Sequence, residues 1–148
     1  MTKSRFTSAD EQIIEPMIAL ADCSKQDRIV VGGLKGVELM LALHRRGYLG
    51  AAATATCGHR ARQYGVALLD WRKRTITALE TTLDWLVGYL SPAGVVVVWV
   101  DAQNPAGQQN LRAALERRGF HIETGTSHEF GFAISARRSE MNPMSKAA

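Results

Sequence analysis

The residues that could do chemistry stand just after short apolar runs, and a group of glycines is the first of them. The run 28–31 is followed by Gly32 and Gly33, and Gly36 comes three residues later. Glycines after a first strand let the backbone approach a ligand closely, and the first amides of the helix that follows favour a negative group. The spacing is neither GxGxxG nor the GK[ST] of a P-loop. A ligand cradle and a purely structural turn both fit these glycines.

A carboxylate and an aromatic ring follow a second apolar run. Asp70 ends the segment that starts at Gly65, and Trp71 comes next. Side chains at the carboxyl end of a strand reach the edge of a sheet where ligands bind, so this pair could hold an amine or an adenine ring. Alternatively, Asp70 caps the next helix or pairs with the basic residues 72–74. Asp101 and Asn104 stand in a similar position after the run 95–100.

Other residue types with catalytic potential are scattered. The two cysteines form no CxxC pair, and we expect free thiols and no structural metal. His128 is predicted in a loop, where it could reach the sheet edge as a general acid or base, although a solvated histidine is the simpler interpretation. No GxSxG, HExxH or nucleophilic cysteine motif is present, which disfavours hydrolases and metalloenzymes. Four histidines share no metal-ligand spacing: His44, His59, His121 and His128.

The elements that must position these residues alternate between helices and strands. Apolar periodicity predicts a helix from a capping box at Ser8, which kinks or restarts at Pro16, and further helices at 36–46, 76–90 and 104–118. The helix after Gly36 is apolar on most faces, so we expect it to be buried. Apolar runs predict strands at 28–31, 51–56, 65–70 and 95–100, with a turn at 91–94.

The last two predicted strands, at 120–122 and 130–134, are joined by a loop alone and are expected to be antiparallel. The strand at 95–100 is apolar on both faces, which is typical of a parallel sheet between helix layers. We therefore predict an α/β fold: a single-domain, three-layer Rossmann-like sheet, mostly parallel, with a C-terminal antiparallel strand pair. Residues 1–27 form an N-terminal helix and loop, 28–138 the α/β domain, and 139–148 a mobile tail.

Length and composition agree with this architecture. The chain has 148 residues, of which 46% are hydrophobic and 22% charged, and such a chain builds one hydrophobic core. Its longest purely apolar run, Val95–Val100, is far below the roughly 18–20 residues of a membrane span. The first residues carry acids and lack the apolar region of a secretory signal. We expect a cytoplasmic protein without membrane contact.

The charge of the chain is uneven. The formal net charge is +4, yet residues 1–27 contain three basic and five acidic side chains, and the remainder contains 15 and nine. Arginines and lysines gather at 45–46, 60–62, 72–74, 117–118 and 137–138. Such a surface could attract nucleic acid. Most of these clusters fall at predicted helix or chain ends, where basic residues suit the helix dipole, so nucleic-acid binding is the less favoured interpretation.

Three stretches resemble the class I S-adenosylmethionine-dependent methyltransferase superfamily. RIVVGGLKGVELMLALHRRGY is similar to the family's first strand, glycine loop and first helix. ALETTLDWLVGYLSPAGVVVVWV is similar to its middle helix, turn and strand, and LRAALERRGFHIETGTSHEFGFAISARR to its last helix and antiparallel strand pair. The resemblance covers about 28–138 and implies S-adenosylmethionine as cofactor.

The family's first motif is only partly present. Gly32 and Gly36 match it and Gly33 is an additional small residue, but Val30 stands at the family's acid position and Leu34 at its middle glycine. In the family a second carboxylate binds both ribose hydroxyls, and losing that contact would weaken cofactor binding, since each charge-assisted hydrogen bond contributes roughly 1.5–3 kcal/mol.

The remaining cofactor positions also depart from the family. The acid that holds the ribose hydroxyls would fall near Thr56 or Cys57, and the chain before Gly65 is too short for the usual helix and third strand. Asp70 occupies a place similar to the family's catalytic position after the fourth strand, so it is the implied catalytic residue. The implied cofactor-binding residues are Gly32, Gly33, Leu34, Gly36, Thr56, Asp70 and Trp71.

Three functions remain open. The first is a small methyltransferase with an unknown acceptor, because methyl transfer needs mainly alignment and no obvious nucleophile. The second is a non-catalytic, methyltransferase-like module that acts in homodimer formation or in binding a protein partner, since an uncovered sheet edge commonly needs covering. The third is nucleic-acid binding through Arg60, Arg62 and residues 72–74 around Trp71.

Overall fold

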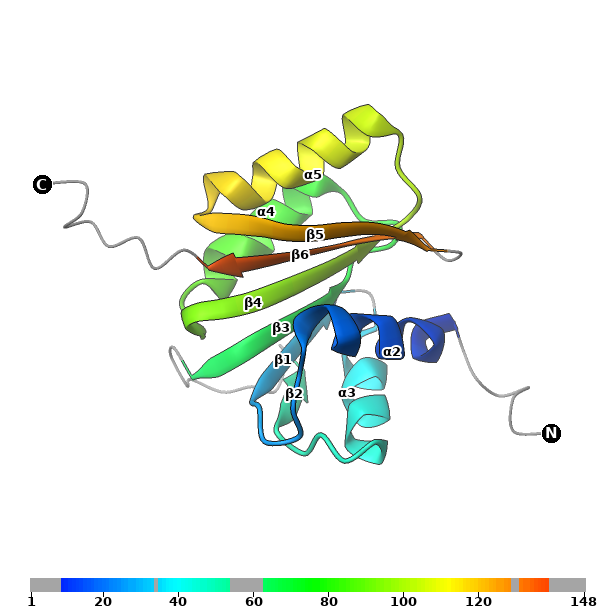
Figure 1. The fold of residues 1–148 in the computed structure, drawn as a ribbon, viewed down its shortest axis with the longest axis vertical. Helices are drawn as coiled ribbons and strands as arrows, with labels where there is room; N and C mark the ends of the chain where they lie inside the picture. Colours follow the sequence, from blue (N-terminus) through cyan, green and yellow to red (C-terminus); the bar gives the residue numbers. More distant parts are fainter. Residues whose placement is uncertain (1–8, 34, 54–62, 129–130, 139–148) are drawn as a thin grey trace, which may run out of the picture.

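The computed structural model describes residues 9–33, 35–53, 63–128 and 131–138. Figure 1 shows one sheet with helices α4 and α5 on one face and α2 and α3 on the other, which confirms the predicted three-layer arrangement. The helices are α2 (Ala9–Ala21), α3 (Gly36–Arg45), α4 (Ile76–Leu86) and α5 (Pro105–Arg117). The strands are β1 (Ile29–Gly33), β2 (Ala51–Ala53), β3 (Tyr64–Asp70), β4 (Leu90–Val100), β5 (Phe120–His128) and β6 (Gly131–Arg138).

The strand order is β2-β1-β3-β4-β6-β5. Strands β2, β1, β3 and β4 are parallel to one another, and β6 pairs antiparallel with both β4 and β5. This confirms the mostly parallel sheet with a C-terminal antiparallel pair. Because β1, β3 and β4 run in the same direction, their carboxyl ends form one edge of the sheet, the edge at which such folds bind ligands.

The core lies on both faces of the central strands. Side chains alternate along each strand, so Leu69 and Val98 pack under α4 and α5, whereas Leu68 and Val97 pack under α2 and α3. All four are buried. A helix layer covers each side of the strand at 95–100, and this explains why apolar side chains are found on both of its faces.

Two glycine-containing segments differ from the prediction. Gly32 and Gly33 are the last residues of β1 rather than a turn after it. The predicted turn at 91–94 is instead part of β4. Tyr64 pairs with Leu90 and Val66 pairs with Val95, so the four residues of this segment form a bulge opposite β3.

Helix α2 continues through Pro16, so of the two expectations for this position, a kink or a restart, the restart is wrong. Proline removes one hydrogen bond of the helix, but Ile13 and Met17 on either side of it are buried against the sheet and hold both halves in place. Several predicted features lie outside the described residues: the cap at Ser8, Leu34, Thr56, Cys57 and the tail 139–148.

The prediction that the helix after Gly36 is buried is wrong. Only Leu39, Ala42 and Leu43 of α3 are buried, and Val37 and Leu41 are each 45% exposed. Helix α3 is amphipathic in its contacts because it lies on one face of the sheet, and its apolar residues on the far side meet no second layer within the described residues.

Cys23 is a free thiol. Burial raises its pKa to about 12, and the nearby carboxylates of Asp27 and Asp22 act in the same direction. The thiol is therefore protonated at neutral pH and is no nucleophile. In the part of the chain that the structure describes, no helix is long and apolar enough to cross a membrane. The same residues contain no cluster of histidine, cysteine or carboxylate side chains that could hold a metal ion.

Candidate functional site

The residues at the carboxyl ends of β1, β3 and β4 are in register. Gly33 pairs with Asp70, and Asp70 pairs with Trp99, so the three lie in a row along the sheet edge. The alternation of side chains places Asp70 on the same face as Leu68, the face covered by α2 and α3, and Trp99 packs on that face too. The sheet edge predicted from the sequence is thus assembled from three strands.

Gly33 is required by the protein's own backbone. Its φ is +101°, and a Cβ atom at this position would overlap the carbonyl oxygen of Asp70. Only glycine adopts this conformation without strain and allows β3 to approach so closely. The structural explanation for a glycine at position 33 therefore holds whether or not a ligand binds there.

Gly36, by contrast, has room for a side chain. A Cβ atom there would lie 3.5 Å from the carbonyl oxygen of Val31, an ordinary contact. Gly36 is the first residue of α3, and Lys35 at the N-cap position has no side-chain oxygen with which to cap the first turn. The first amides of a helix have no partner within the helix, so they can donate hydrogen bonds to an anionic group.

The two other helices that begin at this edge are capped by their own side chains. The hydroxyl of Thr75 accepts a hydrogen bond from the Ala78 amide at 3.1 Å, at the start of α4. The side-chain oxygen of Asn104 accepts one from the Gly107 amide at 2.7 Å, at the start of α5, as predicted for this Asn-Pro pair. Of these three helices, α3 alone lacks such a cap, which makes its N-terminus the one suited to an external anion.

The side chain of Asp70 is fully buried and paired with Arg72. The Arg72 Nε donates to Oδ1 at 2.8 Å and Nη2 donates to Oδ2 at 2.7 Å, and the Arg72 amide lies 3.3 Å from Oδ1. Arg72 itself is only 13% exposed. Of the two alternatives that the sequence left open for Asp70, pairing with the basic residues 72–74 is the one present here. Its carboxylate oxygens are occupied by this bidentate pair, so in this arrangement Asp70 orients Arg72.

Trp71 lies on the other face of the sheet from Asp70. Its ring is buried in the core beneath α4, its Nε1 donates to the Thr75 carbonyl at 2.8 Å, and its amide donates to the Trp99 carbonyl at 2.7 Å. The Arg74 guanidinium covers the ring at 4.6 Å from the ring centroid. Asp70 and Trp71 are therefore not brought together around one ligand, because adjacent strand residues point to opposite faces.

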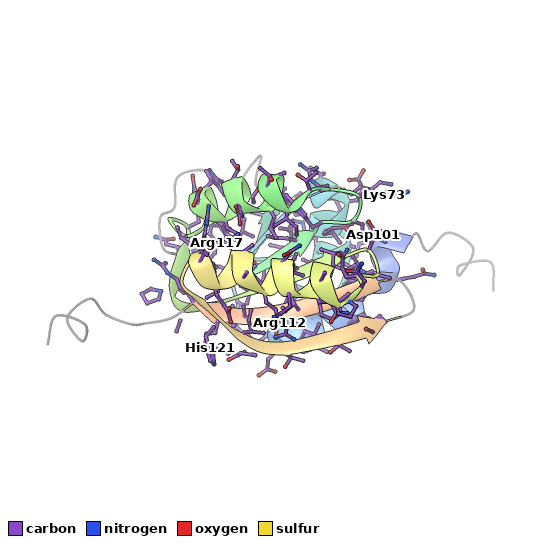
Figure 2. All side chains as sticks on the ribbon, turned by 90° about the horizontal axis from the view of Figure 1, so that it is seen from above. Lys73, Asp101, Arg112, Arg117 and His121 are labelled. Carbon is purple, nitrogen blue, oxygen red and sulfur yellow. The ribbon has the colours of Figure 1, made fainter. Side chains whose placement is uncertain are left out.

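The loops after β3 and β4 are tied to each other. The Lys73 amide donates to Asp101 Oδ2 at 2.6 Å, and Gln103 Nε2 donates to the Asp101 carbonyl at 2.9 Å. Figure 2 shows Lys73 and Asp101 together at one end of the molecule, with Arg117 and His121 at the other. Asp101, considered in the sequence as a second edge carboxylate, thus fixes the loop that carries the basic residues 72–74.

His128 is a site residue whose environment the sequence did not reveal. It is the last residue of β5 rather than part of a loop, and its ring stacks on Trp99 with centroids 4.8 Å apart and an interplanar angle of 30°. Its Nε2 is buried and has no hydrogen-bond partner among the described residues. Gly131, with φ of +141°, makes room for the hairpin, since a Cβ there would overlap the Val100 carbonyl oxygen. His128 thereby joins the same sheet edge as Asp70.

Substitution of His128 with phenylalanine is expected to raise the free energy of unfolding by about 1 kcal/mol. Phenylalanine keeps an aromatic ring against Trp99 and removes a buried nitrogen that lacks a partner, a deficit of about 1–3 kcal/mol. Urea unfolding of the two proteins measures the difference. A lower stability in the variant would mean that the imidazole nitrogen has a hydrogen-bond partner in solution and that this hydrogen bond stabilises the fold.

No protein-family model and no curated protein matches the sequence. Solved structures do match. The ribosomal protein L11 methylase of Lactobacillus delbrueckii subsp. bulgaricus is similar over 86% of this chain and 77% of its own, with a TM-score of 0.65 and 14% identity. An S-adenosylmethionine-dependent methyltransferase of Aquifex aeolicus is similar over 88% of this chain and 89% of its own, with a TM-score of 0.62 and 8% identity.

A third similar structure contains the product form of the cofactor. Geranyl diphosphate C-methyltransferase of Streptomyces coelicolor, solved with S-adenosyl-L-homocysteine, is similar over 86% of this chain and 76% of its own, with a TM-score of 0.63 and 9% identity. The chain therefore has the class I S-adenosylmethionine-dependent methyltransferase fold, as the resemblance implied. At these identities the comparison defines the fold, and the activity must be argued from the site.

Proposed function

We propose that this protein binds S-adenosylmethionine at the carboxyl edge of β1 and transfers its methyl group to an acceptor held near the ends of β3 and β4. The observation that carries the proposal is the start of α3. There, Gly36 leaves room for a Cβ atom at ordinary contact distance, and the side chain of the N-cap residue makes no hydrogen bond to the first amides. The only anionic group of S-adenosylmethionine is its carboxylate, which suits a helix N-terminus.

The residues of this edge would hold and align the reactants. The amides at the start of α3 would bind the carboxylate of the cofactor, and Gly36 would allow close approach. When bound, the cofactor supplies a methyl group on a sulfonium, a good leaving group. The reaction breaks the carbon–sulfur bond, forms a bond from the methyl carbon to the acceptor, and releases any acceptor proton to solvent. Alignment is the main requirement for such a transfer.

Asp70 contributes to this proposal as a positioning residue. Because its carboxylate is engaged with Arg72, it does not serve as the base, and we propose that it fixes the guanidinium at the acceptor side of the edge. An acceptor that is already nucleophilic at neutral pH fits such a site better than one that must first lose a proton to a carboxylate.

Thermal unfolding with millimolar S-adenosylmethionine or S-adenosylhomocysteine tests cofactor binding. Ligand at a hundred times its Kd stabilises the folded state by roughly 2.7 kcal/mol. For a chain of this size we expect a Tm increase of about 5–11 °C. The increase should persist in Gly36→Ala, which adds a tolerated Cβ, and should disappear in Gly36→Trp, whose side chain would block the start of α3.

Absence of a shift with both ligands, in wild-type protein that unfolds cooperatively, would contradict the proposal. The second candidate would then stand: a cofactor-free module of methyltransferase fold. A specific observation favours it, because the Asp70 carboxylate is closed off by Arg72 and the Trp71 ring is buried, so neither offers a free group at the edge.

A further inference from the structure

The loop that follows β3 contains three consecutive basic residues, Arg72, Lys73 and Arg74. The first is neutralised by its ion pair with Asp70. Lys73 and Arg74 are exposed, and neither has a carboxylate partner within the described residues. The other carboxylate of this region, Asp101, accepts a hydrogen bond from the Lys73 amide and so holds the loop backbone. Two cationic side chains therefore remain unneutralised at the carboxyl edge of the sheet.

The other clusters of adjacent basic residues in the described ranges are used within the fold. Four of their arginines form ion pairs with carboxylates: Arg46, Arg117, Arg118 and Arg137. Arg45 also has an interaction within the chain. Arg138 donates to the carbonyls of Val87 and Leu90 at 2.9 and 2.7 Å. The loop after β3 differs from these clusters, and it lies at the edge where such folds bind their ligands.

Arg74 is held in place by an aromatic ring. Its guanidinium carbon lies 4.6 Å from the centroid of the Trp71 ring. That ring is itself fixed, because it is buried and its Nε1 donates to the Thr75 carbonyl at 2.8 Å. A guanidinium that lies over an aromatic ring keeps its N–H donors, whose fork matches two oxygens of a phosphate group. An arginine positioned before the ligand arrives loses less conformational entropy on binding.

Lys73 has a backbone conformation that favours glycine. Its φ is +60°, in the left-handed region that residues with a side chain seldom adopt. The Asp101 carboxylate maintains this conformation by accepting the Lys73 amide hydrogen at 2.6 Å. Glycine would fit the same turn with less strain, so the lysine at this position indicates a role for its ammonium group.

We propose that the methyl acceptor carries a phosphate or diphosphate group, which Lys73 and Arg74 bind. The inference rests on the proposed methyl transfer, although the anion site can be measured without the cofactor. Lysine supplies a compact charge and arginine two parallel donors, a combination that suits a doubly charged group better than a single carboxylate.

A small phosphate-bearing molecule fits this loop better than a nucleic acid does. Nucleic-acid binding uses an extended basic surface that follows the phosphate backbone. Figure 2 shows Arg117 at the other end of the molecule from Lys73, and Arg117 is already paired with Glu80. Two cations on one short loop are enough for one phosphate or diphosphate group.

Thermal unfolding in sodium pyrophosphate, compared with sodium chloride at equal ionic strength, tests the proposal. Pyrophosphate at ten times its Kd should raise the wild-type Tm by about 3–6 °C. Lys73→Gly and Arg74→Gln should each weaken binding by at least about tenfold, since each removes a charge-assisted hydrogen bond. Lys25→Gln is the matched control: it removes an exposed lysine that precedes β1, at the opposite edge of the sheet, and should bind pyrophosphate like wild type.

Lys73→Gly separates anion binding from folding. Glycine adopts a φ of +60° without strain, so the Tm without pyrophosphate should stay the same or rise while the affinity falls. This variant decides the outcome if Arg74→Gln loses stability by uncovering Trp71.

Three results would overturn the proposal. If pyrophosphate does not raise the Tm of wild type, no such anion site exists. A shift that persists in Lys73→Gly and disappears in Gly36→Trp places the anion at the start of α3 instead. A short single-stranded RNA that binds more tightly than pyrophosphate and loses affinity in Lys73→Gly would make nucleic acid the ligand of the loop.

Parallel melts with S-adenosylhomocysteine report on the cofactor separately. A shift with S-adenosylhomocysteine and none with pyrophosphate overturns the phosphate-bearing acceptor and leaves the proposed cofactor site intact. A shift with pyrophosphate alone contradicts the proposed methyl transfer, and the loop then binds an anion that is not a methyl acceptor.

Discussion

Substitution of Arg72 with leucine is expected to lower the free energy of unfolding by about 3–5 kcal/mol, because the variant leaves a buried carboxylate without its partner. The Asp70 side chain is 0% exposed, and both of its oxygens accept hydrogen bonds from the Arg72 guanidinium at 2.7 and 2.8 Å. Water cannot replace those bonds unless the edge of the sheet opens. Urea unfolding monitored by tryptophan fluorescence measures the loss.

Two further variants separate this explanation from a general effect of losing an arginine. Arg118→Leu breaks a pair with Asp84, whose side chain is 63% exposed, and should cost only about 0–1 kcal/mol. The double variant Asp70→Leu, Arg72→Leu removes both charges and should recover most of the stability lost by Arg72→Leu. A cost below about 1 kcal/mol for Arg72→Leu would show that the Asp70 carboxylate reaches water or another cation in solution.

The parts of the fold that the sequence predicted well are those with local signals. The apolar run 95–100 needed two covering layers and has them, and Asn104 caps α5 as its position before a proline indicated. The antiparallel pairing of the last two strands followed from the short connection between them. Each of these depends on residues that are close in sequence.

The parts that could not be predicted depend on contacts between distant residues. His128 stacks on Trp99, which is 29 positions earlier, because β6 lies between β5 and β4 in the sheet. The apolar periodicity of the sequence does not indicate the order of the strands in the sheet, and that order is what brings the two rings together. The apolar character of Val37 and Leu41 similarly suggested a buried helix, since composition does not reveal whether a second layer exists above α3.

For the site residues too, local sequence predicts some features, and contacts between distant residues decide the others. The adjacency of Asp70 and Trp71 predicts that they share one ligand, yet the alternation of strand side chains separates them, and Arg72 returns to the Asp70 side once the chain has left β3. The sequence leaves open whether Asp70 caps a helix or pairs with a cation, because the basic residues 72–74 and then the start of α4 at Ile76 follow it. Only the position of the loop after β3, held by Asp101, distinguishes the two.

Gly33→Ala is expected to lower the free energy of unfolding by about 3 kcal/mol or more, which for this chain length corresponds to a Tm decrease of about 6–12 °C. Two costs add. The φ of +101° is unfavourable for any residue with a side chain, and the new Cβ would overlap the backbone carbonyl of Asp70, which cannot rotate away. Differential scanning calorimetry without ligand measures the effect.

Gly36→Ala is the matched control, and comparing it with Gly33→Ala assigns a cause to each glycine. The Gly36 Cβ would meet only the Val31 carbonyl at 3.5 Å, and alanine suits a helix better than glycine by up to about 1 kcal/mol, so stability should stay the same or rise slightly. A fold that tolerates alanine at 36 and not at 33 needs glycine at 33 for its own packing and leaves the start of α3 free of such a packing constraint. Equal losses in both variants would make both glycines structural and remove the main support for a cofactor at the start of α3.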